Sequence, residues 1–277
     1  MTTFGALPQR TTAVRLRLRS AIALAVVSLV GLMGFTWPLL VSGAGRGEGF
    51  AHANDAPWLF VALLPLLLAV VLAEISDGGM DAKAIALLGV LAACGAALRP
   101  LGTGTTGVEP VYFLLILSAR VLGRGFGFVL GALTLFASAL LTAGVGPWLP
   151  FQMLAAAWVG FFAGCLPPLR GRAEVWMLAV YGVVAGLLYG LVMNLWFWPF
   201  GAGVEVASNL AFDPQASLVT NVRHFIAFDL TTSLGYDIPR AVTNLVLVLV
   251  AGRAVLGALR RAARRAAFDA PVEFKEA

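Results

Sequence analysis

The sequence predicts an all-helical protein that crosses a membrane several times. Hydrophobic residues make up 60% of the 277 residues, charged residues make up only 12%, and the mean hydropathy is +0.90. A soluble domain carries roughly 25% charged residues. The apolar residues also gather in long runs. Such runs predict transmembrane helices, because a helix that crosses a bilayer needs about 20 apolar residues. Proline, glycine and charged residues separate the runs and indicate where the helices end.

Eight spans are expected from these runs. The first run, Ser20–Val41, is longer than the roughly 7–15 residues of a signal-peptide core, so we interpret it as a retained span. The fourth is too short to cross a bilayer unless it tilts or extends into the loop Gly102–Gly107. A long polar stretch, Phe200–Tyr236, is expected as a loop before the last span. The expected spans are Ser20–Val41, Trp58–Ala73, Ala82–Leu98, Pro110–Val121, Gly125–Ala143, Pro150–Leu166, Val175–Trp196 and Ile238–Leu259.

The distribution of positive charge predicts the orientation of these spans. If the N-terminus is cytoplasmic and the spans alternate, the 19 Lys and Arg residues fall on the inner side except for Arg46, Arg99, Arg223 and Arg240. Cytoplasmic loops of membrane proteins are enriched in Lys and Arg. We therefore expect a multi-pass protein of the plasma membrane with both termini in the cytoplasm. The net charge of +5 reflects this topology and is not a sign of nucleic-acid binding.

Polar and aromatic side chains gather on the predicted outer face, which indicates a binding site there. Gln152 lies in the first turn of an apolar span, and in lipid such a group needs a partner or a polar ligand. Tryptophans at this face fit an interfacial aromatic belt, and they also suit a flat organic ligand that needs stacking surfaces. The candidate substrate-binding residues are Arg99, Glu109, Trp148, Gln152, Asn194, Trp196, His224 and Asn244.

The third span carries small residues along one face. Ala82, Ala86, Gly89, Ala93 and Ala97 follow one another at steps of three or four residues, which places them on one side of a helix. Such faces let another helix approach closely in lipid. Packing within this chain and contact with a separate membrane subunit both fit the pattern.

Several chemistries lack support in the sequence. Gly123-Arg-Gly-Phe-Gly looks superficially like a phosphate loop, but it lacks the Lys-Ser/Thr of that motif and no strand precedes it. His52 and His224 are the only histidines and have no metal-binding spacing. No expected span has an acidic residue at its middle, since Glu74, Asp77, Asp81 and Glu109 fall at span ends and Asp229 and Asp237 lie in or near the outer loop. This disfavours an ion-coupled transporter. Cys94 and Cys165 lie inside apolar runs and are expected to be small buried packing residues.

One segment resembles a known family. Gly144-Val-Gly-Pro-Trp-Leu-Pro-Phe-Gln-Met, followed by Gly160-x-x-x-Gly164, is similar to the outer-loop signature of the substrate-specific S components of energy-coupling factor transporters. The version in the cobalamin- and corrinoid-related branch has Thr and Trp where this chain has Leu149 and Phe151. The resemblance implies a six-helix membrane core at 81–265. It leaves 1–80 as an N-terminal segment with two extra spans, and 266–277 as a cytoplasmic tail.

The resemblance also implies a function. S components bind a vitamin or its precursor, cobalamin-related in this branch, at the outer face and perform no chemistry. They act with a membrane coupling subunit and two cytoplasmic ATPases, so the ATP is used by partner subunits and this chain needs no cofactor. The interface with the coupling subunit would fall on Ala82, Ala86, Gly89 and Ala93.

Two other functions stay open at this point. A membrane-embedded transferase or hydrolase would have to use Glu109 with His224, which is the one plausible acid–histidine pair at one face. A structural membrane subunit would use the small-residue face to assemble a complex without binding a ligand.

Overall fold

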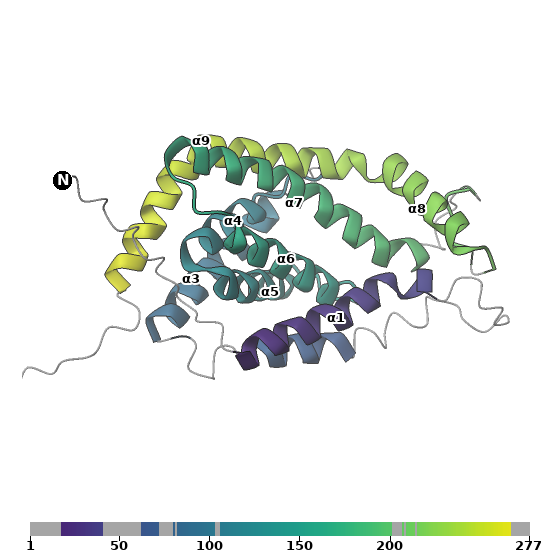
Figure 1. Cartoon of the computed structure of the whole chain (residues 1–277), viewed down its shortest axis with the longest axis horizontal. Coiled ribbons are helices and arrows are strands. Elements are labelled where there is room, and N and C mark those ends of the chain that lie inside the picture. Colours follow the sequence, from purple (N-terminus) through teal and green to yellow (C-terminus); the bar gives the residue numbers. More distant parts are fainter. Residues whose placement is uncertain are drawn as a thin grey trace, which may run out of the picture.

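The computed structural model describes residues 18–40, 62–71, 80, 82–102, 106–200, 207, 209–213 and 215–266. Within these ranges every regular element is helical (Figure 1). The elements are α1 (Leu18–Leu40), the helix Ala62–Val71, α3 (Ala82–Leu98), the 3₁₀ turn η2 (Arg99–Gly102), α4 (Val111–Leu122), α5 (Arg124–Leu141), α6 (Leu149–Cys165), α7 (Gly171–Phe200), α8 (Leu218–Thr232) and α9 (Leu234–Ala266).

Five of the described helices are long and apolar enough to cross a bilayer. They are α1, α3 with η2, α5, α7 and α9. The helices Ala62–Val71, α4 and α6 are apolar but shorter. The chain is therefore a multi-pass helical membrane protein, as its composition predicts.

The short helix α4 lies inside the bundle. Its 12 residues extend only about 18 Å at 1.5 Å per residue, which is less than the hydrocarbon thickness of a bilayer. Ten of those residues are buried, and α3, α5, α6, α7 and α9 all pack against it. Because neighbouring helices enclose α4, it does not have to span the lipid by itself.

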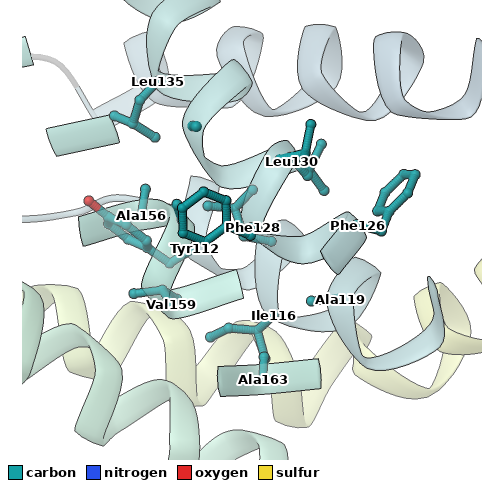
Figure 2. Close-up of a cluster of buried hydrophobic side chains, with 14 of the residues drawn as sticks. Tyr112, Ile116, Ala119, Phe126, Phe128, Leu130, Leu135, Ala156, Val159 and Ala163 are labelled. Carbon is teal, nitrogen blue, oxygen red and sulfur yellow. The ribbon is translucent and has the colours of Figure 1, made fainter. Parts of the chain in front are cut away.

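A close backbone contact joins α5 to α6, which form the most extensive helix pair among the described helices. A methyl group on Gly127 would lie 2.6 Å from the carbonyl oxygen of Gly160, and one on Gly160 would overlap the carbonyl of Gly127. Gly131 lies in the same way against Ala156. Side chains from α4, α5 and α6, including Ile116, fill the space around this contact (Figure 2). Small residues let helices approach closely in lipid, where van der Waals packing drives their association.

An ion cluster joins three helices at the end of the bundle where α7 begins. Glu174, whose side chain is 2% exposed, accepts hydrogen bonds from Arg120 Nε at 2.8 Å and from Arg260 Nη2 at 2.7 Å. Arg120 also donates to the carbonyl oxygens of Leu166 and Leu169, at 2.9 and 3.1 Å. The cluster therefore ties α4, α7, α9 and the connection between α6 and α7 together.

Two expectations from the sequence are wrong. The stretch Phe200–Tyr236, expected as a loop, contains α8 and the start of α9. Ser217 caps α8 by accepting a hydrogen bond from the Thr220 amide at 3.2 Å. Cys94 and Cys165, expected to be buried, are both exposed free cysteines, because each lies on a helix face that points away from the bundle.

The small-residue face of α3 also points outward. The inner face of α3 consists of buried residues such as Leu88 and Leu91. Ala82, Ala86, Gly89, Ala93 and Ala97 are all exposed, and no atom lies within 4 Å of a Cβ placed on Gly89. The face is thus not used for packing within the described part of this chain.

Two glycine substitutions test the role of the contact between α5 and α6. We expect Gly160→Leu to prevent stable folding, because the new side chain meets the α5 backbone, which has no room to move. Gly89→Leu is the matched control, and it should leave the melting temperature within a few degrees of wild type. Both variants are compared by thermal unfolding of the purified protein in detergent. Similar melting temperatures for the two variants would contradict the close contact.

Candidate functional site

A buried arginine organises the end of the bundle that lies opposite the Glu174 cluster. The side chain of Arg240, in α9, is 9% exposed. Its Nε donates to Glu109 Oε2 at 2.6 Å and its Nη1 donates to Asp237 Oδ1 at 2.5 Å. A buried charge must be paired, because transferring an unpaired ion out of water is costly. Glu109 and Asp237 therefore supply the neutralising carboxylates from the segment before α4 and from the first turn of α9.

Two tyrosines enclose this charge cluster. The Tyr189 ring of α7 has its centroid 5.2 Å from Arg240 Cζ, which is the geometry of a cation–π contact. The Tyr112 ring of α4 lies 4.8 Å from the Tyr189 ring. Both tyrosines are buried. They close the inner side of the cluster with aromatic surface.

A row of glycines on α7 makes room for the polar residues of α9. Gly182, Gly186 and Gly190 are four residues apart and so share one face. A methyl group on Gly190 would overlap the carboxylate of Asp237, and one on Gly182 would lie 3.0 Å from Asn244 Cβ. Asn244 donates to the Gly182 carbonyl at 3.1 Å. Its Oδ1 is buried and has no hydrogen-bond partner among the described residues.

The segment before α4 is also shaped by a glycine. Gly107 has a φ of +74°, which strains any residue with a side chain. It lies directly against the backbone of Tyr236. This contact brings the segment onto the start of α9, and Glu109 follows two residues later at hydrogen-bonding distance from Arg240.

A second polar pair lies at the same end of the bundle. Arg99 Nη2, in η2, donates to Gln152 Oε1, in the first turn of α6, at 2.9 Å. Both side chains are half-buried. Phe151, next to Gln152, packs its ring 5.5 Å from that of the buried Trp196. Trp148 is 40% exposed, and its Nε1 donates to the Gly144 carbonyl at 3.2 Å.

The remaining polar candidates hold α8 in place. Asn194 of α7 donates to Asp229 Oδ1 at 2.6 Å and to Ser233 Oγ. His224 Nδ1 lies 2.9 Å from the carbonyl oxygen of Ala211. Figure 1 shows α8 at one end of the molecule, beyond α7 and α9. These contacts tie α8 and the segment before it to the rest of the bundle.

The structure therefore brings together some of the predicted site residues. Arg99 pairs with Gln152, and Trp196 lies beside Phe151 in the same region. Glu109 pairs with Arg240 and His224 contacts Ala211, so the described residues do not form the Glu109–His224 pair that a transferase or hydrolase would need. Asn194 contacts α8, and Asn244 lies deeper, between α7 and α9.

The site residues expected from the sequence do not include Asp237, Arg240, Tyr112 or Tyr189. Asp237 and Arg240 follow one another at i and i+3 in an otherwise apolar stretch, and this spacing indicates an ion pair on one helix face. The repeated Gly-x-x-x-Gly from Gly182 to Gly190 was a second usable signal, because it predicts a close helix contact.

Comparisons of the chain with protein-family models, with curated proteins and with solved structures find no match. The fold and the site define the class of protein: a multi-pass helical membrane protein with a buried, charge-paired cluster at one end of its bundle.

Replacing Arg240 tests whether its charge organises this end. We expect Arg240→Met to lower the free energy of unfolding by about 3–5 kcal/mol, because Glu109 and Asp237 lose their shared cation. Arg99→Met removes a half-buried hydrogen bond to a neutral amide and should cost about 1–2 kcal/mol. Unfolding by sodium dodecyl sulfate in mixed micelles measures both changes.

A charge-neutral control separates the charge effect from the loss of volume. The triple variant Arg240→Met with Glu109→Gln and Asp237→Asn has no buried charge left unpaired in this cluster, so it should regain most of the lost stability. Equal instability of the single and triple variants would show that packing, and not charge pairing, governs this end of the bundle.

Proposed function

We propose that this chain is the substrate-binding membrane subunit of an ATP-driven importer of the energy-coupling factor type. The observation that carries the proposal is the concentration of partly accessible polar side chains at the end of the bundle that holds Arg240. Residues from η2, α6, α7, α9 and the segment before α4 meet there. Polar groups inside a membrane protein are costly and mark functional sites by default.

The proposed site has an accessible layer and a supporting layer. Arg99, Gln152 and Glu109 form the accessible layer, since Arg99 and Gln152 are half-buried and the Glu109 side chain is 26% exposed. Arg240, beneath Glu109, is buried and orients the carboxylate. A ligand that carries an acceptor group would take over the hydrogen bond that Arg99 now donates to Gln152.

The chemistry of the accessible layer fits a polar organic compound of the vitamin class. Arg99 offers a charged donor, Gln152 offers both a donor and an acceptor, and Glu109 offers an acceptor. The exposed ring of Trp148 adds a stacking surface. In this proposal Asn194 and His224 position α8 beside the site, Trp196 supports the turn that carries Gln152, and Asn244 fixes α9 against α7. The chain captures its ligand without chemical conversion.

The partners in this proposal dock on the exposed small-residue face of α3. Ala82, Ala86, Gly89 and Ala93 form an open strip along that helix, and a helix of the coupling subunit can approach it closely. α1 packs on α6, α7 and α8 and so adds to the proposed substrate-binding core 81–265 away from this strip. The energy source is a pair of ATPase subunits, because the chain lacks a nucleotide-binding motif.

Ligand retention by the purified chain tests the proposed site. We expect the protein isolated from its native membrane to carry a polar organic compound that mass spectrometry identifies. Gln152→Ala removes one hydrogen-bonding side chain and leaves Arg99 without its partner, so it should lower the retained amount about tenfold. Gln215→Ala is the matched control, because Gln215 is an exposed residue next to α8. Equal retention by wild type and Gln152→Ala, or no polar compound in wild type, would contradict the proposal.

A further inference from the structure

A lateral groove runs between α1 and the pair formed by α5 and α6. It has a volume of about 650 Å³, within the range of roughly 300–1,000 Å³ that is usual for small-molecule sites. The polar groups along it are few: Trp158 Nε1 donates to Ser28 Oγ at 3.0 Å, and Arg124 lies at the groove. Its apolar lining includes Leu24, Leu29, Leu32, Phe128, Phe161 and Phe162.

The contacts between α1 and α6 show which end of the groove Arg124 occupies. Ser28 meets Trp158 and Gly34 meets Phe151, so the two helices run antiparallel. The start of α1 therefore lies near the end of α6. A methyl group on Gly164, near that end, would lie 2.5 Å from Arg124 Cα. Arg124 thus lies at the Ala21 end, and Leu32 lies at the other end.

The length of the groove matches one leaflet of a bilayer. Ala21 and Leu32 both line it, and the helix between them rises about 17 Å at 1.5 Å per residue. Half of a hydrocarbon core of about 30 Å is about 15 Å. A groove of this length runs from the headgroup level at Arg124 to about the middle of the membrane.

The groove opens sideways, and it has one free cation at its end. Leu29 is 60% exposed, Leu32 is 50% exposed and Phe162 is 54% exposed, so an occupant enters from the lipid. Arg124 is exposed, and its side chain has no ion pair with another described residue. It also begins α5, where the free backbone amides and the helix dipole favour an anion.

We propose that this groove holds one acyl chain of an anionic phospholipid, whose phosphate pairs with Arg124. The apolar lining takes the chain, the lateral opening admits it, and Arg124, the one cation that lines the groove, favours a negatively charged headgroup. The bound lipid would fill the space between α1 and the bundle. This role is independent of the polar cluster around Arg240, which lies at the opposite end of the bundle.

Native mass spectrometry of protein released from nanodiscs tests the proposal. The nanodiscs contain equal amounts of phosphatidylglycerol and phosphatidylcholine. We expect wild type to retain one lipid and to prefer phosphatidylglycerol about fivefold, as one basic residue near the membrane surface provides. Arg124→Gln should remove the preference. Arg172→Gln is the matched control, because Arg172 is also an exposed arginine in the first turn of a helix, and it should keep the preference.

A second pair of variants tests the groove itself. Ala25 lines it and is exposed, so Ala25→Trp should fill the groove and reduce retention of both lipids. Val26→Trp, on a neighbouring exposed position outside the lining, should change nothing. Wild type without retained lipid, or the same loss in Arg172→Gln as in Arg124→Gln, overturns the proposal. A lipid-free dimer that only Ala25→Trp disrupts would assign the groove to a second copy and also overturn it.

Discussion

The positive charge of Arg240 inside an apolar bundle is the constraint on which the site end of this protein depends. A guanidinium in that position has to be paired with carboxylates. Glu109 comes from the segment before α4, Asp237 comes from the first turn of α9, and the Tyr189 ring of α7 covers the charge. Residue 190 is a glycine, and any side chain there would overlap the Asp237 carboxylate. At this end of the bundle, this one charge holds α4, α7 and α9 together.

The same three helices are tied together again at the other end. Glu174 of α7 pairs there with Arg120 of α4 and Arg260 of α9. α4, α7 and α9 thus form a unit that is fixed by ion clusters at both ends, and the short α4 lies within it. α5 and α6 meet each other through glycine contacts, and both pack against α4 of this unit. The interior of the bundle is thus fixed by ion pairs and close packing, while the outward faces of α1 and α3 are exposed to lipid or another chain.

The sequence predicted where the helices begin and end better than it predicted which of their faces are buried. Runs of apolar residues located α3, α4, α5 and α6 to within two residues, because proline, glycine and arginine end those runs sharply. α8 was missed because Arg223, His224 and Asp229 interrupt its apolar pattern. The burial of Cys94 was predicted wrongly for a different reason. In a membrane, residues that face lipid are as apolar as residues that face the core, so hydropathy does not tell the two faces apart.

The residues of the site were partly predictable, but their pairing was not. Arg99 and Gln152 were both candidates, yet they are 53 positions apart in the chain, and only the packing of α3 against its neighbours brings them together. Arg240 was expected on the outer side, but the ion pair that its spacing from Asp237 within one helix turn allows was not predicted. Glu109 was therefore assigned to the ligand alone, without its structural partner.

Transport by a reconstituted complex is the measurement that decides whether this chain belongs to an ATP-driven importer. The complex is isolated through a tag on this chain and placed in liposomes, and accumulation of the compound that co-purifies with it is followed with ATP or with a non-hydrolysable analogue. If the chain is part of an ATP-driven importer, the compound accumulates with ATP only. Accumulation should be lost in Gly89→Leu, because that side chain would obstruct the exposed face of α3. A complex that contains no ATPase, or accumulation that does not depend on ATP, would contradict the account.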